Sequence, residues 1–276
     1  MEGSIKLAHG DWYAEILPHF GMNAIVLRHC GNDILRSPKD LEELKGSPYL
    51  FGTPFLFPAN RTKGGKFGFS GKEYSLPLNE PTRNNHIHGL FYDAPFEVIE
   101  RTSDSLVAKY VNRGERYPFS FTIIMADRLA ESGYTRTVRI TNDGKAAFPF
   151  TMAFHTTFIE PKWFSSPIGK RLEVDENYIP TGKALDTVEE YREGVSPFGK
   201  KISGFFMRDG EAALVGNYVY RFSDGFDNVI LFNALGEMGL LCIEPQAGET
   251  NGLNSGKCKI LEPNEEVVFS HEIGIL

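Results

Sequence analysis

Hydrophobic and polar residues alternate with a period of two along much of the chain. Positions 135–141 alternate without a break and are followed by the turn sequence Asn142-Asp143-Gly144. Phe119, Phe121 and Ile123 share one face of a second run, and a third run has Val267, Phe269, His271 and Ile273 on one face. Because successive side chains of a strand point to opposite faces, this pattern predicts strands with one buried face.

Two other runs, 228–232 and 240–243, are apolar at almost every position. Such runs are typical of strands buried on both faces, and Gly236 and Gly239 between them suit a hairpin. Strand follows strand with few helices, so we predict an all-β fold, a large antiparallel β-sandwich. The chain has no internal repeat and no low-complexity linker. We therefore expect residues 1–276 to form a single domain.

Helical signals are few. Ser37 is a suitable N-cap, Pro38 suits the first turn and Gly46 stands where a C-terminal glycine belongs, which predicts a helix between them. A second short helical turn is expected within 186–192. The segment 161–203 is the least periodic part of the chain, and we expect it to form long loops.

Composition narrows the class of protein. The 276 residues include 29 Lys and Arg and 36 Asp and Glu, a net charge of −7, and no basic run, so we expect no nucleic-acid partner. Cys30, Cys242 and Cys258 show no paired spacing, which favours a reducing compartment, and we expect a cytoplasmic location. The first residues lack the apolar segment of a signal peptide, and the longest apolar runs are too short to span a bilayer. We therefore expect no membrane partner.

Asn60 and Arg61 follow an apolar run and precede a glycine turn. A planar guanidinium at this position can make paired hydrogen bonds to vicinal hydroxyls or to a carboxylate. The alternative is a solvated surface arginine, which is the commoner situation.

Two histidines, His86 and His88, form a His-x-His pair whose side chains would face the same way in a strand. They suit either a sugar-binding histidine or a metal site of the cupin type, with Asp93 as a further ligand. Two ordinary loop histidines are the third interpretation.

Two kinds of residue are candidates for proton transfer: His155, and a glutamate that precedes a proline. His155 lies in an aromatic run, where a histidine is more often a packed core residue, although its ordinary pKa suits proton transfer. Glu244 ends an apolar run, and Pro245 should stop the strand there. Burial at such a site raises the pKa of a carboxyl towards that of a useful base. Glu160 and Glu262 have similar surroundings, and local sequence does not separate the three.

Taken in order, these stretches resemble the galactose mutarotase-like, or aldose 1-epimerase, family over nearly the whole chain. The Asn-Arg pair with its following Gly-Gly turn matches Asn60-Arg61, and the family's Asn-x-Leu-His-Gly segment resembles residues 85–89. The catalytic histidine of the family matches His155. Its catalytic glutamate in an apolar-Glu-Pro context matches Glu244.

The resemblance implies a β-supersandwich and an enzyme that interconverts the α and β anomers of an aldose. It implies that Glu244 is the base and His155 the acid, and that Asn60, Arg61 and His88 bind the sugar. Only protons move in this reaction, so neither a metal nor a cofactor is implied.

The chain also departs from the family pattern. Thr157, Leu90 and Phe232 stand where other residues are common in the family, and its sugar-binding aspartate has no clear match among Asp186, Asp209 and Asp227. These departures concern the choice of sugar. A hexose 6-phosphate is one alternative substrate, with a cationic rim formed by Lys63, Lys66 and Arg83. A protein that binds sugar without catalysis is another alternative.

Overall fold

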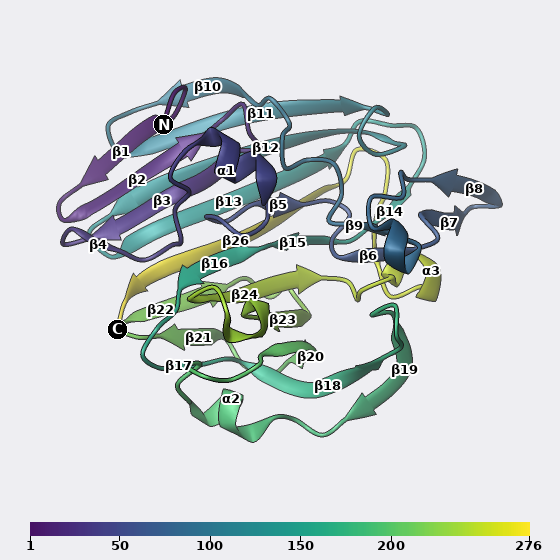
Figure 1. The fold of residues 1–276 in the computed structure, drawn as a ribbon. Helices are drawn as coiled ribbons and strands as arrows, with labels where there is room; N and C mark the ends of the chain where they lie inside the picture. Colours follow the sequence, from purple (N-terminus) through teal and green to yellow (C-terminus); the bar gives the residue numbers. More distant parts are fainter.

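A computed structural model describes residues 1–276 and consists mainly of two eight-stranded sheets (Figure 1). The first of these sheets has the strand order β10-β11-β12-β13-β26-β22-β21-β17. Its strands are β10 (Glu97–Arg101), β11 (Ser105–Arg113), β12 (Ser120–Ala130), β13 (Gly133–Asn142), β26 (Glu266–Ile275), β22 (Tyr218–Phe222), β21 (Ala212–Val215) and β17 (Phe164–Ser165).

The second eight-stranded sheet carries most of the site described below and includes β16 as a branch that pairs with β24. In spatial order its strands are β19 (Pro180–Leu185), β18 (Ile168–Val174), β20 (Ser203–Arg208), β23 (Asn228–Phe232), β24 (Leu240–Ala247), β15 (Met152–Phe154) and β5 (Phe55–Leu56), with β16 (Thr156–Ile159) beside them. A separate four-stranded sheet contains β1 (Ile5–His9), β2 (Trp12–Leu17), β3 (Asn23–His29) and β4 (Asn32–Asp33).

Short elements complete the fold. Three two-stranded sheets pair β6 (Arg61–Lys63) with β9 (Asn85–Ile87), β7 (Lys66–Phe69) with β8 (Lys72–Ser75), and β14 (Phe148–Phe150) with β25 (Lys259–Leu261). The helices are α1 (Leu41–Gly46), α2 (Glu189–Glu193) and α3 (Gly252–Ser255), with the 3₁₀ turns η1 (Pro81–Arg83) and η2 (Ala234–Gly236). None of these helices has the length and apolar character needed to cross a membrane.

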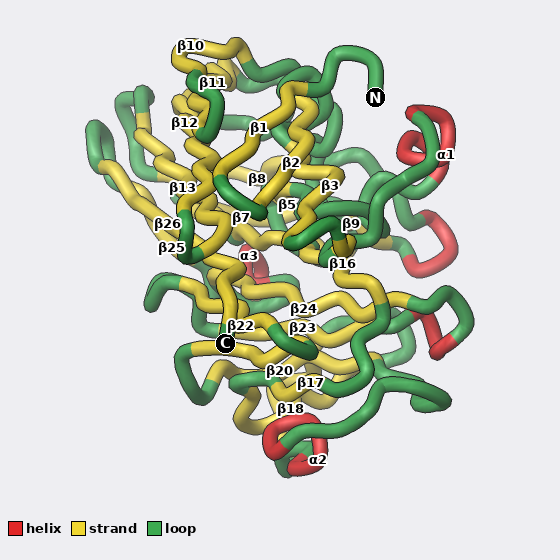
Figure 2. The backbone as a smooth tube through the Cα atoms, turned by 90° about the vertical axis from the view of Figure 1, so that its left-hand side faces the viewer, coloured by secondary structure: helices red, strands yellow, loops and turns green.

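The prediction of an all-β antiparallel sandwich is confirmed. Strands predicted from alternation, such as β12 and β13, pair antiparallel and bury every second side chain. Their buried faces contribute to one cluster of 49 buried apolar residues, which extends in sequence from Leu7 to Ile273. Figure 2, turned by 90° from the view of Figure 1, shows that strands make up most of the molecule, with β10 to β13 in its upper part and β18, β20, β23 and β24 in its lower part.

The predicted first helix exists, but its start was predicted wrongly. The helix begins at Leu41, and Asp40 is the N-cap, whose carboxylate accepts a hydrogen bond from Glu43 N at 2.8 Å. The Glu43 carboxylate in turn accepts from Lys39 N at 2.7 Å. The Asp40 carboxylate thus satisfies one free N–H group of the first turn, and the Glu43 carboxylate fixes the backbone just before the N-cap, neither of which Ser37 would do.

The prediction of long loops over 161–203 is wrong for much of that segment. It contains β17 and the hairpin of β18 and β19, and the expected helical turn within 186–192 is present as α2. The hairpin escaped detection because β19 is an edge strand with exposed side chains at nearly every position, so it lacks an alternating pattern.

The hairpin of 228–232 and 240–243 is confirmed, whereas Pro245 does not end its second strand. β24 continues to Ala247, and Val229 is the cross-strand partner of Pro245. Glu244 therefore lies inside a strand, opposite Ile230, and not at a strand end.

Candidate active site

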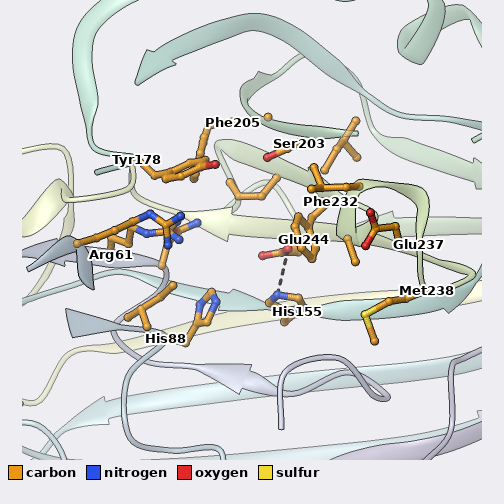
Figure 3. A pocket seen from close by; sticks show the side chains of 18 residues that line it. Arg61, His88, His155, Tyr178, Ser203, Phe205, Phe232, Glu237, Met238 and Glu244 are labelled. Carbon is orange, nitrogen blue, oxygen red and sulfur yellow. Dashed lines mark hydrogen bonds and ion pairs between the residues drawn. The ribbon is translucent and has the colours of Figure 1, made fainter. Parts of the chain in front are cut away.

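A cavity of about 500 Å³ opens on the second eight-stranded sheet (Figure 3). Its walls come from β6, the end of β9, the junction of β15 and β16, β20, β23 and β24, and from two connections, the β18–β19 turn and the β23–β24 loop. Segments distant in sequence thus meet at one place. The five residues predicted to carry chemistry all line this cavity: Asn60, Arg61, His88, His155 and Glu244.

Glu244 is held on the cavity wall by the regular pairing of β24. Its side chain is 3% exposed, and its strand pairs with β23 on one side and with β15 and β16 on the other. The two glutamates with similar local sequence lie elsewhere, since Glu160 is only half-buried, Glu262 is exposed and neither lines the cavity. The structure therefore separates three residues that the local sequence leaves equivalent.

His155 occupies the break between β15 and β16, where its backbone N–H donates to Pro54 O at 3.0 Å. Its Nε2 lies 3.3 Å from Glu244 Oε1. The His88 ring stands edge-on to the His155 ring at a centroid distance of 5.2 Å, and Tyr49 packs against both histidines. Nδ1 of His88 and Nδ1 of His155 are buried without a protein partner.

Burial controls the protonation of the pair. Desolvation raises the pKa of Glu244 to about 8, although the positive charge of Arg61 acts in the opposite direction. Desolvation lowers the pKa of His155 to about 4. Both shifts have the same cause, because a site with little water disfavours charge. Between about pH 4 and pH 8, the carboxyl therefore holds the proton and the imidazole is neutral.

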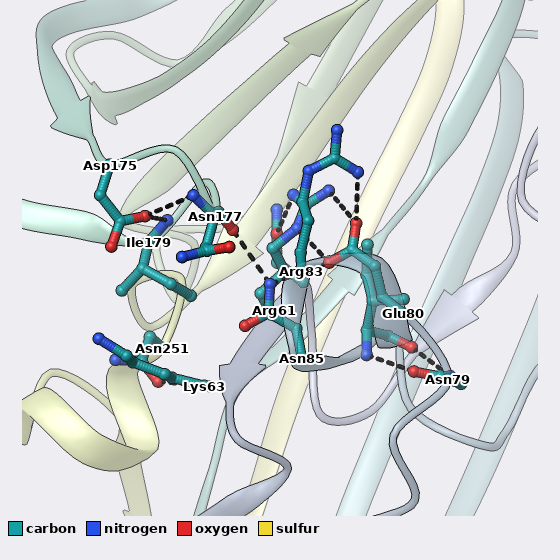
Figure 4. A network of polar contacts seen from close by, with 12 residues as sticks. Arg61, Lys63, Asn79, Glu80, Arg83, Asn85, Asp175, Asn177, Ile179 and Asn251 are labelled. Carbon is teal, nitrogen blue, oxygen red and sulfur yellow. Dashed lines mark hydrogen bonds and ion pairs between the residues drawn. The ribbon is translucent and has the colours of Figure 1, made fainter.

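Arg61 is held in place by Glu80 (Figure 4). Its Nε and Nη2 donate to the two carboxylate oxygens of Glu80 at 2.8 and 2.9 Å, a bidentate pair. Arg83 also donates to Glu80, at 3.2 Å, and both guanidinium groups lie against the Tyr178 ring at 4.9 and 4.8 Å from its centre. The remaining nitrogen, Nη1 of Arg61, has only a 3.4 Å contact with Asn60 Oδ1. One donor group of Arg61 is thus available to a ligand.

The sequence profile of the family described as aldose 1-epimerase matches residues 24–234, which is most of the chain. The chain belongs to the aldose 1-epimerase family. Two Escherichia coli K12 proteins are similar to it in part: YihR is 26% identical over 187 residues, 64% of this chain and 59% of YihR, and YphB is 29% identical over 105 residues, 38% of this chain and 36% of YphB. Each match thus spans less than two thirds of the relative's own length.

Solved structures are similar over almost the whole chain. A galactose mutarotase-like protein from Clostridium acetobutylicum has a TM-score of 0.90 at 26% identity, with 99% of this chain and 95% of that chain covered. A galactose 1-epimerase from Lactobacillus acidophilus has a TM-score of 0.80 at 16% identity, with 99% and 94% covered. These similarities agree with the sandwich fold of this member of the aldose 1-epimerase family.

The cupin-type metal site considered for this family member is not formed. β9 ends at Ile87, and His88 has a left-handed backbone with φ of 63°, so the two histidines do not face the same way. His86 lies outside the cavity lining, with its Nδ1 2.7 Å from Pro77 O. Asp93 forms an ion pair with Arg116 instead.

Sequence reasoning missed several residues that line the cavity and one, Glu80, that orients a lining residue from outside it. Tyr178 comes from the β18–β19 turn, and Glu80, which orients Arg61, precedes η1. Glu80 is followed by a proline, as Glu244 is, but no apolar run precedes it, so the sequence does not mark it as a candidate. The β23–β24 loop adds Glu237 and Met238, which Figure 3 shows on the side of Glu244 opposite Arg61. Nothing in the local sequence marks Tyr178 or this loop.

None of the three aspartates considered for sugar binding lines the cavity. Asp209 pairs with Arg192, Asp227 pairs with Lys259, and Asp186 lies beyond β19. The acidic side chains that do line it are Glu237 and Glu244.

The family departures differ in their relation to the cavity. Phe232 lines it, whereas Thr157 and Leu90 do not. Thr157 instead directs its hydroxyl towards His155 O and Cys242 Sγ, at 3.2 and 3.4 Å. Of these three departures, only that at Phe232 alters the wall itself.

The predicted cationic rim is not formed as a cluster. Lys66 pairs with Glu73 across the β7–β8 hairpin, and Lys63 is exposed outside the lining. Of the three residues, only Arg83 lines the cavity.

Proposed function

We propose that the cavity binds an aldose and that Glu244 and His155 interconvert its α and β anomers. The observation that carries this proposal is the 3.3 Å approach of Glu244 Oε1 and His155 Nε2 on the cavity wall. The anomeric hydroxyl and the ring oxygen are bonded to the same carbon atom, so a base and an acid that serve them must be neighbours. Membership of the aldose 1-epimerase family supports the same reaction.

Ring opening needs one proton removed and one added. The Glu244 carboxylate takes the proton of the anomeric hydroxyl while the His155 imidazolium gives a proton to the ring oxygen. The bond between C1 and the ring oxygen breaks, and the bond between C1 and O1 becomes a carbonyl. Each well-placed proton-transfer group typically contributes on the order of 10²–10⁴ in rate.

Ring closure uses the same two groups in reverse. After opening, Glu244 carries the proton and His155 is neutral, which is the state that burial favours. Rotation about C1–C2 presents the other face of the carbonyl to the new hydroxyl. His155 accepts the proton of that hydroxyl, Glu244 returns its proton to the carbonyl oxygen, and the other anomer forms. The pair ends in its starting state.

Three further residues are proposed to orient the sugar. Arg61 offers Nη1, because Glu80 occupies its other nitrogens. His88 offers a buried Nδ1 without a protein partner, and Asn60 is buried beside Arg61. Fixing the sugar so that both proton transfers can act is itself a large part of catalysis.

One feature of the cavity suits a hexose 6-phosphate as an alternative to a neutral aldose. Arg83 lines the cavity with its side chain 39% exposed, and it shares Glu80 with the better-buried Arg61. Comparing glucose with glucose 6-phosphate in wild type and Arg83→Gln separates the two substrates, since only the phosphorylated sugar should lose affinity in the variant.

We also propose a cytoplasmic location, in agreement with three free cysteines.

Polarimetry and NMR of freshly dissolved α-glucose and α-galactose test the proposal. We expect the purified protein to accelerate anomer exchange and Glu244→Gln to lower kcat/KM by at least about 10²-fold. Glu262→Gln, a matched change at an exposed Glu-Pro step, should leave the rate unchanged. Equal rates for wild type and Glu244→Gln would refute the assigned base. Calorimetric sugar binding with no effect on exchange would favour a non-catalytic sugar-binding protein.

A further inference from the structure

Three side chains of metal-ligating type meet at one end of the four-stranded sheet, outside the cavity described above. Asp11 lies in the turn between β1 and β2, His29 ends β3, and Cys30 begins the turn between β3 and β4. Their ligand atoms all lie within 4.8 Å of one another. Figure 1 shows the two turns next to each other at the left edge of the molecule.

The spacing of two of these atoms matches a tetrahedral zinc site. Cys30 Sγ lies 3.6 Å from His29 Nε2. With a Zn–S bond of about 2.3 Å and a Zn–N bond of about 2.0–2.1 Å, a tetrahedral angle separates sulfur and nitrogen by about 3.5 Å. An ion can therefore bridge these two atoms without a rearrangement of the backbone. A carboxylate oxygen of the exposed Asp11 lies within 4.8 Å of the ligand atoms of His29 and Cys30, where it can supply the third ligand.

The surrounding structure holds the ligands in place. Trp12 and His29 are cross-strand partners, and their rings stack at a centroid distance of 4.5 Å. Cys30 N donates to Asp11 O at 3.0 Å, which ties one turn to the other. A hollow of about 330 Å³ beside them is lined by Asp11, His29 and Glu131 among others, so the ligands are accessible to ions from solvent.

We propose that Asp11, His29 and Cys30 form a binding site for one zinc-like divalent cation. A thiolate and an imidazole favour such ions over Mg²⁺ and Ca²⁺, which prefer oxygen ligands. Binding releases the thiol proton of Cys30 and leaves the fourth position to water or to the Glu131 carboxylate. The ion links the β1–β2 turn to the β3–β4 turn. This proposal does not depend on the proposed function.

The experiment uses the full chain, freed of metal by a chelator, with Co²⁺ as a probe. In a Trp163→Phe background Trp12 is the remaining tryptophan, since the chain has two. We expect one equivalent of Co²⁺ to quench Trp12 fluorescence, to produce thiolate-to-cobalt charge-transfer absorption, and to be displaced by Zn²⁺. Cys30→Ser should abolish the absorption and weaken binding more than tenfold, and His29→Gln should also weaken it more than tenfold. Cys258→Ser should change neither.

Two outcomes would overturn the proposal. One is the absence of stoichiometric binding to the wild-type protein at micromolar Co²⁺ or Zn²⁺. The other is binding that survives Cys30→Ser but is lost in Cys242→Ser. That result would place the ion at His155, Cys242 and Glu244, the second group of ligand atoms within 4.8 Å of one another. Anomer exchange by Cys30→Ser should equal that of wild type whether or not metal binds.

Discussion

Protonation of single side chains controls the proposed chemistry at the residue scale. Ring opening needs a carboxylate on Glu244 and an imidazolium on His155, whereas burial favours the carboxyl and the neutral imidazole. The two forms contain the same number of protons, so they interconvert without exchange with solvent. Their ratio is therefore independent of pH as long as the pair holds one proton in total.

The first prediction is the pH dependence of kcat/KM. The pair gains a second proton below about pH 4, set by His155, and loses its only proton above about pH 8, set by Glu244. We expect a broad plateau of kcat/KM between these limits. The value should fall on the acid side because a doubly protonated pair has no base to accept a proton, and on the alkaline side because the unprotonated pair has no acid to donate one. Polarimetric rates corrected for uncatalysed exchange measure this profile. A steep dependence between pH 5 and 7 would contradict it.

The second prediction concerns Arg61. Lysine at this position cannot make two parallel bonds to Glu80 while packing on Tyr178. We expect Arg61→Lys to raise KM for the aldose by about 10-fold or more, as expected for a charged hydrogen bond worth roughly 1.5–3 kcal/mol. Arg83→Lys is the matched control, because Arg83 is more exposed, and should change KM for a neutral sugar less than about threefold. Equal effects would remove the special role of Arg61.

At the scale of elements, turns and short connections bring the residues of the site together. His88 follows β9, and the next residue, Gly89, forms an isolated bridge with Phe57 beside the apolar run that leads to Asn60. Gly89 has φ of +68°, and a Cβ there would lie 2.0 Å from the carbonyl oxygen of Phe57. The close approach of these two backbones brings the Asn60-Arg61 pair next to His88.

This contact gives the third prediction. Gly89→Ala should destabilise the protein by much more than about 1–2 kcal/mol, the usual cost of a left-handed conformation for a residue with a Cβ. Gly64→Ala is the control, because Gly64 has φ of +66° and nothing within 4 Å of a Cβ, so only the conformational cost remains. Denaturant unfolding compares the two variants. Similar losses would show that the contact with Phe57 relaxes easily.

At the scale of the whole molecule, a buried ion pair links the two eight-stranded sheets. Arg136 on β13 and Asp127 on β12 are fully buried, with two bonds of 2.7 and 2.8 Å between them. Tyr134 OH donates to Asp127 at 2.7 Å, and Arg136 Nη1 donates to Thr53 O at 2.9 Å, two residues before the start of β5. The pair thus connects the first eight-stranded sheet to the edge of the second, near the residues that hold His155.

The fourth prediction follows from the cost of an unpaired buried charge. Asp127→Ala should lower the free energy of unfolding by about 3–5 kcal/mol, and a double change to Asp127→Leu with Arg136→Met should recover most of that loss. Glu266→Gln, which breaks the exposed pair with Arg139, should change stability by less than about 1 kcal/mol. Chemical denaturation measures all three. A double variant as unstable as the single one would contradict the argument.

The single-domain organisation proposed for residues 1–276 is tested at the same scale. The largest apolar cluster includes residues from Leu7 to Ile273, so loss of either sheet removes part of its packing. We expect one calorimetric transition whose van't Hoff and calorimetric enthalpies agree. Two separate transitions would show that the chain folds as two domains.

The amino-acid sequence by itself determined the strands and the residue types of the site. Period-two alternation is a local property, so β12 and β13 could be predicted from it, and the hairpin of β23 and β24 could be predicted from two uninterrupted apolar runs with glycines between them. The exposed edge strand β19 could not, because it has no buried face and therefore no pattern.

Only the tertiary structure decided which of the candidate residues meet. Glu160, Glu244 and Glu262 have the same local surroundings, and a carboxyl gains a raised pKa only where other segments exclude water from it. The same holds for Glu80 and Tyr178, which orient and contact Arg61 from separate loops. Cavity walls depend on contacts between distant segments, and no local pattern records such contacts.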